Sequence, residues 1–213
     1  MPQIFHRQFD LFFKLGVLFI IAAVAGSYVL WRLIFIPAVA APVRQPVPFS
    51  HKHHVGDDGI DCRYCHTSVE TGPFAGLPPT STCMTCHSQL FRDAPMLEPV
   101  RESMRTGQPL RWNRVYFLPG FAYFDHSIHI AKGVGCESCH GRVDQMPLMW
   151  RNEHVDMSFC LSCHRNPDPN LRPLDQVFRM GWRPAGPDQG AALHQAYHLR
   201  SGEQLSNCSV CHR

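Results

Sequence analysis

The sequence predicts a mostly α-helical and irregular fold, in which one N-terminal transmembrane helix precedes a domain of short helices and long loops. Three observations support this prediction. A run of 22 residues, Leu15 to Ile36, contains a single charge, and all ten cysteines fall in five copies of the pattern Cys-x-x-Cys-His. The segment from Asn166 to Gly190 is rich in proline and glycine and has no periodicity, which is typical of a loop.

The apolar run is long enough to cross a membrane. As a helix it spans about 33 Å, and the hydrocarbon core of a bilayer is about 30 Å thick. Trp31 and Arg32 lie near its outer end, and Arg7 and Lys14 flank the other end, so the positive-inside tendency places the N-terminus in the cytoplasm. The alternative is a cleaved signal peptide, because Ala38 to Ala40 resembles a cleavage site, but the apolar run is longer than a usual signal core.

The composition divides the chain into three parts. Residues 1–36 are predicted to form a short cytoplasmic N-terminus and the membrane anchor. Residues 37–48, which close with the letters APVRQPVP, are predicted to form a proline-rich linker that ends the helix. Residues 49–213 are predicted to form the exported domain, with short helices at Pro99 to Arg105 and in the segment GAALHQAYHLRSG.

The five Cys-x-x-Cys-His copies, numbered motif 1 to motif 5 along the chain, each match the signature for attachment of a c-type haem. In such a site two thiols add to the two vinyl groups of the haem, and the histidine becomes the proximal ligand of the iron. The predicted attachment residues are Cys62 and Cys65, Cys83 and Cys86, Cys136 and Cys139, Cys160 and Cys163, and Cys208 and Cys211. The predicted proximal ligands are His66, His87, His140, His164 and His212.

Disulfides and zinc are the alternative uses of these cysteines. Secreted proteins form disulfide frameworks, and paired Cys-x-x-Cys units form zinc sites. The constant gap and the histidine after every pair argue against disulfides, and five pairs do not divide evenly into four-cysteine zinc sites. The motifs therefore predict five covalently attached haem c groups. Because these haems are attached outside the bacterial cytoplasmic membrane, the domain is expected on the periplasmic side of that inner membrane.

The phrase Phe-x-His-x-x-His precedes two motifs in each half of the domain. It occurs at Phe49 to His54 and at Phe124 to His129, which predicts an internal repeat of two haems each, residues 49–90 and 124–165, and a fifth haem in residues 190–213. Histidines at i and i+3 lie on one side of a helical turn, so each can reach a different iron. The alternative is that they are polar surface residues. The predicted distal iron ligands are His51, His54, His126 and His129.

The fifth distal ligand stays open in the sequence. A methionine opposite a histidine raises the potential of a haem relative to two histidines. Methionines also fill gaps against apolar surfaces, so each has a packing alternative. The candidates are Met146, Met149, Met157, His154, His194 and His198, while His53 adjoins His54.

The formal charge of +3 is that of the side chains alone. Each ferric haem adds roughly one negative charge, from a positive iron–porphyrin centre and two propionates. Five haems bring the molecule close to neutrality. The mild basicity of the sequence therefore gives no reason to expect a nucleic-acid partner.

The phrase Phe-x-His-x-x-His followed by Cys-x-x-Cys-His resembles the multihaem cytochrome c3 and c7 class. The segment PLRWNRVYFLPGFAYFDHSIHIAKGVGCESCHGRVDQM, Pro109 to Met146, continues to MSFCLSCHR, Met157 to Arg165, and resembles the pentahaem cytochrome subunit of alternative complex III. The five motifs, the N-terminal anchor and the terminal letters NCSVCHR extend this resemblance over nearly the whole chain.

The resemblance implies an electron-transfer subunit that is not an enzyme on its own. In that family a membrane complex oxidises quinol and passes electrons outward. The implied partners are polytopic quinol-binding membrane subunits, an iron–sulfur subunit, a periplasmic cytochrome c or terminal oxidase, and the membrane lipid. A methionine on one haem would also fit the family, and Met146 and Met157 fall in its motif region.

Two other functions fit parts of the sequence. A multihaem reductase needs an iron with an open position, but all five motifs end in histidine and eight further histidines lie on the exported side. A stand-alone membrane quinol dehydrogenase that feeds a periplasmic reductase is the other alternative. Against it, Cys62 follows the anchor by some 25 residues, and no motif continues as Cys-x-x-Cys-His-x-Met.

Overall fold

The computed structural model describes residues 7–35 and 39–212. Ile36, the last residue of the predicted anchor, lies outside the described residues, as do the first two residues of the predicted linker. The chain divides into two compact units, residues 1–38 and residues 39–213.

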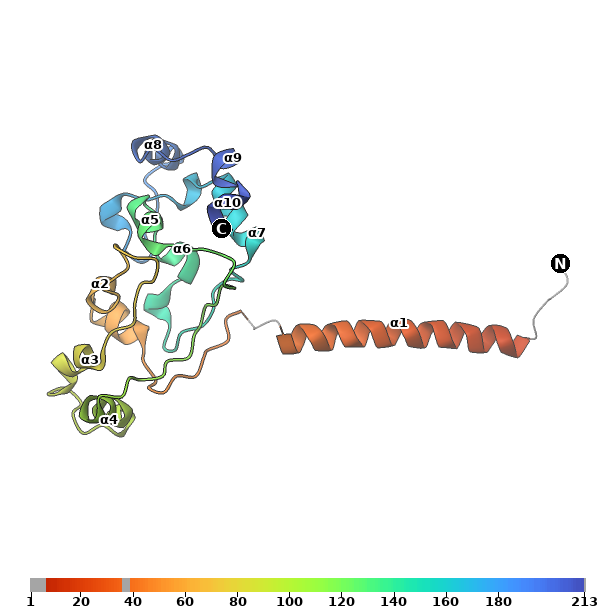
Figure 1. Cartoon of the computed structure of the whole chain (residues 1–213), viewed down its shortest axis with the longest axis horizontal. Coiled ribbons are helices and arrows are strands. Elements are labelled where there is room, and N and C mark those ends of the chain that lie inside the picture. Colours follow the sequence, from red (N-terminus) through yellow and green to blue (C-terminus); the bar gives the residue numbers. More distant parts are fainter. Residues whose placement is uncertain (1–6, 36–38, 213) are drawn as a thin grey trace. The chain divides into compact units, whose positions relative to one another are not determined.

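The first unit contains helix α1, Arg7–Phe35, of 29 residues (Figure 1). Its segment Gln8–Ile34 has a mean hydropathy of 2.1, and its apolar side chains are exposed rather than packed in a protein core. Among the described residues it is the one helix whose length and composition suit a membrane span, a test that a signal sequence also meets. Lys14 forms an ion pair of 2.8 Å with Asp10, one turn earlier.

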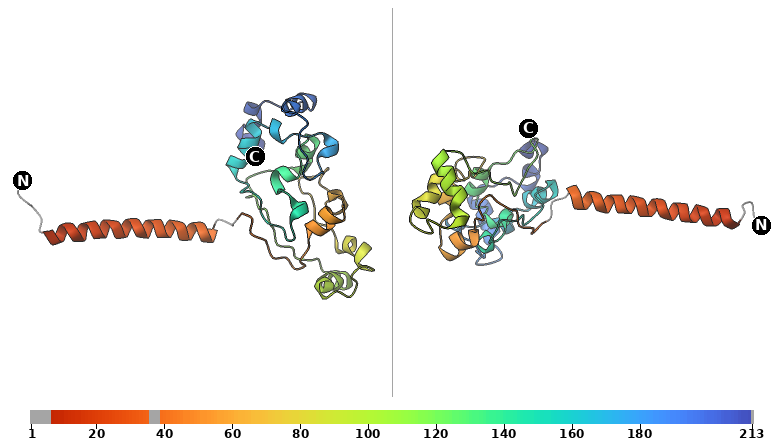
Figure 2. Two further views of the ribbon diagram at one scale, coloured as in Figure 1. Left: turned by 180° about the vertical axis from the view of Figure 1, so that it is seen from behind. Right: turned by 90° about the horizontal axis from the view of Figure 1, so that it is seen from below.

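The second unit consists of short helices joined by long loops, as Figures 1 and 2 show from three directions. Residues 39–212 contain no β-strand, only two isolated antiparallel bridges, Pro42 with Trp150 and Val134 with Leu171. The α-helices are α2 (Cys62–Cys65), α3 (Thr80–His87), α4 (Glu98–Thr106), α5 (His126–Ala131), α6 (Glu137–His140), α7 (Met157–Arg165), α8 (Gln189–Ala196), α9 (Gly202–Leu205) and α10 (Cys208–Cys211). The predicted fold class, mostly helical and irregular, is confirmed.

Shorter turns of other helix types complete the second unit. One is a π-helix, η1 (Lys52–Asp57), and the others are 3-10 helices, η2 (Pro95–Leu97), η3 (Val143–Gln145), η4 (Asp168–Asn170) and η5 (Leu174–Gln176). The last two lie in the segment predicted as a loop. The helix predicted at Pro99 to Arg105 is α4, which ends at Gly107 with a φ of 70°.

Each motif lies on or directly beside a short helix, which places its two cysteines on one side of a helical turn. Motifs 1, 3 and 5 coincide with α2, α6 and α10, and motifs 2 and 4 occupy the ends of α3 and α7. Asp61, Asp156 and Asn207 precede three of these helices, and each side chain accepts a hydrogen bond from a backbone N–H of the first turn. These side-chain caps therefore fix the first turn of α2, α7 and α10, the helices that carry motifs 1, 4 and 5.

The protein atoms of the second unit form a very small apolar core. A domain of this size ordinarily buries about two thirds of the surface that its unfolded chain exposes. Within the described residues the buried apolar side chains are Val47, Val69, Val100, Val143, Met146, Leu171 and Val177. So small a core agrees with an interior that prosthetic groups complete.

The two predicted repeats contact each other through η1 and η3. The backbone N–H of Lys52 donates to the carbonyl of Met146, with a distance of 3.0 Å. A Cβ on Gly56 would lie 2.3 Å from the carbonyl oxygen of Asp144, so this close approach requires glycine. Met146 is 1% exposed at this contact, where it fills buried space between the repeats.

Residues 39–48 of the predicted linker are part of the second unit and pack against its later segments. The N–H of Val43 donates to the carbonyl of Met149 over 2.9 Å. The side-chain amide of Gln45 donates to the carbonyl of Asn113 over 2.9 Å and accepts from its N–H over 2.8 Å. The described part of this proline-rich segment is thus packed on the domain that it precedes.

Candidate haem-binding sites

Four of the five predicted proximal histidines lie opposite a second histidine ring. Two imidazoles on opposite sides of one metal ion, each with a metal–nitrogen distance of about 2 Å, place their ring centroids roughly 6 Å apart. The observed centroid distances are 6.5 Å for His51 and His66, 6.1 Å for His54 and His87, 6.3 Å for His126 and His140, and 6.1 Å for His129 and His164. The spacing of all four pairs suits one iron between two rings.

The pairs differ in the angle between their ring planes. His51 and His66 are 3° from parallel, and the corresponding pair of the second repeat, His126 and His140, is 6° from parallel. In contrast, the planes of His54 and His87 make an angle of 68°. The rings of His129 and His164 are tilted by 35°. The first member of each Phe-x-His-x-x-His phrase therefore belongs to a parallel pair, and the second to a crossed or tilted pair.

Hydrogen bonds to backbone carbonyls orient most of these rings. Since a carbonyl oxygen only accepts, the Nδ1 atom of each such ring carries the proton and donates, which leaves Nε2 with a free lone pair for a metal. Seven of the nine predicted axial histidines have this arrangement, with distances of 2.6–3.0 Å. They are His54, His66, His87, His126, His129, His164 and His212, and their acceptors are Ser50, Gly76, Leu90, Pro73, Asp125, Leu205 and Phe121.

Burial keeps three of these imidazoles neutral. Burial, the largest cause, and neighbouring histidines together lower the pKa of His51 to about 4 and that of His140 to about 4. Burial also lowers the pKa of His129. A neutral imidazole is the form that binds a metal, so the buried rings hold the protonation state that an iron ligand requires.

A phenylalanine holds both histidines of each phrase. Phe49 is stacked on His54, with centroids 4.4 Å apart and planes 24° apart, and meets His51 edge-on at 4.9 Å. In the second repeat Phe124 is stacked on His129 at 4.6 Å and meets His126 edge-on at 4.7 Å. The sequence contained this signal, because the phenylalanine has the same place in both phrases, but its positioning role is visible only in the structure.

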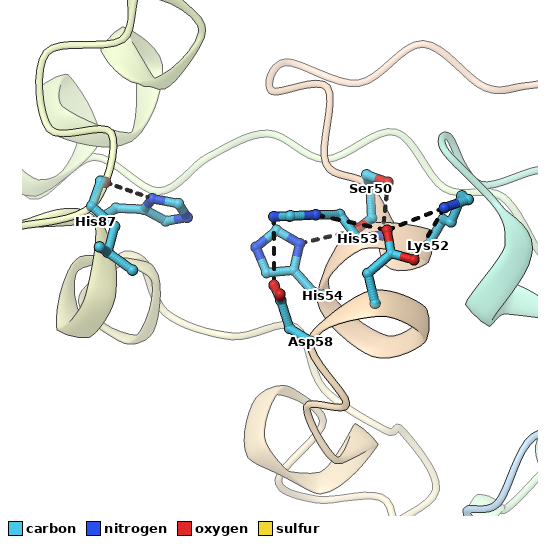
Figure 3. Close-up of polar contacts among 8 residues, drawn as sticks. Ser50, Lys52, His53, His54, Asp58 and His87 are labelled. Atoms are coloured by element: carbon cyan, nitrogen blue, oxygen red, sulfur yellow. Dashed lines mark hydrogen bonds and ion pairs between the residues drawn. The ribbon is translucent and has the colours of Figure 1, made fainter.

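His53 and His54 are adjacent in sequence but face different partners (Figure 3). The ring of His54 points toward His87, while Nε2 of His53 lies 3.5 Å from a carboxylate oxygen of Asp58. His53 is also 3.8 Å from Asp57 through Nδ1. His53 thus lies beside two exposed carboxylates. His54 is the ring that lies opposite His87.

His212 lies beside no second histidine ring within the described part of the chain. Its neighbour is Phe121, with centroids 6.0 Å apart and planes 32° apart, and its Nδ1 donates to the carbonyl of the same residue. His194 is held through Nδ1 by a carboxylate oxygen of Asp168, 2.6 Å away, on the contact between α8 and η4. The bond to Asp168 holds His194, and the bond to Phe121 holds His212, so neither histidine faces the other.

The other candidates for the fifth distal ligand have varied surroundings. Met146 is buried at the contact between the repeats, whereas Met157, the first residue of α7, is 67% exposed. His154 and His198 are exposed. Met149 contributes its carbonyl to the segment that precedes the first repeat. No contact of these side chains selects one of them for motif 5.

The ten cysteines form no disulfides with one another, and side chains of different motifs approach one another. The pKa of Cys136 is raised by its interaction with the Cys62 thiol and by burial. Burial, the largest cause, and the nearby thiols of Cys163 and Cys160 together raise the pKa of Cys139 to about 11. The cysteine side chains of different motifs therefore lie close to one another.

The residues present fit a haem c at each motif. Every motif supplies two cysteines on one side of a helical turn and a histidine beside them, and four motifs also face a second imidazole. Within the described residues, no three histidine, cysteine, aspartate or glutamate side chains gather as they do around a bound metal ion. Paired rings and paired thiols are instead the donor set of axial ligation and covalent attachment. The site defines a multihaem c-type cytochrome.

A comparison with known proteins agrees with this class. The chain is 34% identical to the multihaem cytochrome c subunit of the menaquinone reductase of Nitratidesulfovibrio vulgaris (strain Hildenborough) over 143 residues, which cover 57% of this chain and 68% of that protein. No protein-family model matches the chain. The chain belongs to the family of this multihaem cytochrome c subunit. The predicted multihaem cytochrome c class is thereby confirmed, whereas the matched protein is a subunit of a menaquinone reductase and not of alternative complex III.

Proposed function

We propose that this chain relays electrons within a membrane complex that exchanges electrons with the quinone pool. The observation that carries the proposal is the set of four histidine pairs with ring centroids 6.1–6.5 Å apart. An iron with a histidine on each face has no open position for a substrate, so such a site transfers electrons only. Bound haem supplies one-electron redox chemistry, and the chain supplies its attachment, its axial ligands and its apolar surroundings.

The anchor is part of the same proposal. Helix α1 has the length and composition to hold the cytochrome domain at the periplasmic face of the inner membrane. A single helix does not by itself build a quinone pocket or a proton path. Quinone chemistry therefore belongs to polytopic partner subunits, and an iron–sulfur subunit is a suitable electron carrier between them and this chain.

The relative favours electron flow toward the membrane. That protein is a subunit of a menaquinone reductase, and a complex of that kind would use this chain to pass electrons from a periplasmic donor toward a quinone. A second candidate has the opposite direction. The segment from Pro109 to Met146 resembles alternative complex III, in which this chain would carry electrons from quinol to a periplasmic cytochrome c or a terminal oxidase.

Isolation of the native complex tests the proposal. Membranes are solubilised gently, the haem-stained complex is purified, and its subunits are identified by mass spectrometry. We expect a polytopic quinone-binding subunit and an iron–sulfur protein to co-purify with this chain. Isolation with a periplasmic reductase alone would contradict the proposal and favour a stand-alone quinol dehydrogenase. Rates of haem reduction by menaquinol and of menaquinone reduction by the reduced complex then decide between the two directions.

A further inference from the structure

We infer that the five motifs form one unbranched row in the order 2, 1, 3, 4, 5, so that motifs 2 and 5 are the two ends of the row. The inference rests on the proposed electron-relay function. It differs from the order of the sequence, in which motif 1 directly follows the anchor and would be one end.

Motif 2 adjoins motif 1 in two ways. The hydroxyl of Tyr64, inside motif 1, lies 2.8 Å from the hydroxyl of Thr85, inside motif 2. In addition, Phe49 contacts the rings of both His51 and His54, which face the proximal histidines of motifs 1 and 2. The two sites therefore share one short segment of chain on their distal side and a side-chain contact on their attachment side.

Motif 1 adjoins motif 3 although 70 residues separate them in the sequence. The thiol of Cys62 donates to the carbonyl of Phe178 over 3.9 Å, and the N–H of Cys136 donates to the neighbouring carbonyl of Val177 over 3.3 Å. The same pair of neighbouring peptide units thus contacts both motifs.

A second loop joins motifs 1 and 3 through their axial histidines. Nδ1 of His66 donates to the carbonyl of Gly76, and Nδ1 of His126 donates to the carbonyl of Pro73, each over 2.7 Å. One five-residue segment, residues 73–77, therefore orients the proximal histidine of motif 1 and the distal histidine of motif 3. These contacts place motif 1 in the interior of the row and make the link between the two repeats.

Motif 3 adjoins motif 4 through α5. His126 and His129 on this helix face the proximal histidines of motifs 3 and 4, and Phe124 contacts both rings. This link repeats the arrangement of motifs 2 and 1.

Motif 4 adjoins motif 5 through α9. The proximal histidine of motif 4, His164, donates from Nδ1 to the carbonyl of Leu205 over 2.9 Å, and α9 packs against α7. Leu205 lies three residues before Cys208, the first cysteine of motif 5. Motif 5 therefore continues the row beyond motif 4.

Redox titration of single-ligand variants tests the order. Replacement of a distal histidine by methionine raises the potential of that haem, which is then reduced earlier. Its added electron lowers the potentials of its nearest neighbours. For His51→Met, NMR-resolved titration of the haem-loaded chain should therefore show lower potentials at motifs 2 and 3 and none of this shift at motif 5. The matched variant His129→Met should shift motifs 3 and 5 and leave motif 2 unchanged.

A shift at motif 5 in His51→Met, or at motif 2 in His129→Met, would overturn the order. If either variant fails to assemble, the pairwise interaction potentials of the unsubstituted chain give the same test, because motifs 2 and 5 should then be the least coupled pair. These readouts do not depend on the partner complex. Thus a chain that purifies without a quinone-binding subunit yet keeps this coupling pattern would refute the proposed function alone.

Discussion

The imidazole rings of His51 and His66 lie 6.5 Å apart and 3° from parallel, although they come from different elements of the first repeat. The equivalent rings of the second repeat, His126 and His140, repeat this arrangement at 6.3 Å and 6°. Two independent copies of one geometry, reached through different loops, are difficult to attribute to packing alone. The relationship supports a common purpose for both pairs, which is to hold an iron between two imidazoles.

The ring angles predict two kinds of electron paramagnetic resonance (EPR) signal. Parallel imidazoles make the energies of two iron d orbitals unequal, namely those with lobes above and below the porphyrin plane. This inequality gives a rhombic low-spin spectrum. Crossed imidazoles leave these orbitals nearly equal in energy, which gives a highly anisotropic spectrum. We therefore expect rhombic signals from the haems of motifs 1 and 3 and a highly anisotropic signal from motif 2, whose rings are crossed by 68°. Identical signals from all haems would contradict these angles.

Substitution of His54 should remove one distal ligand. In His54→Ala, we expect one haem in five to become high-spin in the oxidised protein, because His87 then has no ring opposite it. His53→Ala is the matched control, since the ring of His53 lies next to Asp58. It should leave all EPR signals unchanged. A high-spin signal in the control rather than in His54→Ala would show that the two histidines have exchanged roles.

Substitution of Phe124 should disturb two haems at once. In Phe124→Leu, the apolar volume is largely kept, but the flat face on His129 and the edge contact with His126 are lost. We expect five haems to remain attached, the EPR signals of motifs 3 and 4 to broaden, and stability to fall by about 0.5–1.5 kcal/mol for each lost ring contact. The equivalent change Phe49→Leu should affect motifs 1 and 2 instead. Equal effects on every motif would argue against a local positioning role.

Tyr116 should stabilise the surroundings of motif 3. Its half-buried hydroxyl donates to the carbonyl of Cys139 over 3.1 Å and accepts from the N–H of Asn152 over 2.9 Å. Tyr116→Phe leaves both groups without this partner, which we expect to cost about 1–3 kcal/mol in the free energy of unfolding by guanidinium. The control Tyr64→Phe removes an exposed hydroxyl contact and should cost less, because water replaces it. An equal or larger loss in the control would contradict this account.

Local sequence predicted the parts of the site that depend on neighbouring residues. A Cys-x-x-Cys-His motif contains its own attachment geometry, because residues three apart share a side of a helical turn. The helix at Pro99 to Arg105 was likewise predictable from a short segment and is α4. The two Phe-x-His-x-x-His phrases predicted which segments carry the histidines that lie opposite motif histidines.

The remaining features depend on tertiary contacts that no local pattern records. Only folding places His51 opposite His66 and His54 opposite His87, since both distal rings come from one segment of chain. The hydrogen bond from the Gln45 side chain to the carbonyl of Asn113 likewise joins residues that are 68 positions apart. For the same reason the sequence left the distal ligand of motif 5 open, and it remains a prediction among methionine and histidine candidates.

Peptide mass spectrometry of the mature protein tests the central claim most directly. Proteolysis under non-reducing conditions separates the five motif segments, and the mass of each shows what its cysteines carry. The account predicts one haem joined by two thioether bonds to each motif, including Cys208 and Cys211 at the C-terminus. A motif peptide with free thiols, a disulfide or a zinc-dependent mass change would contradict the claim that all five segments hold haem c.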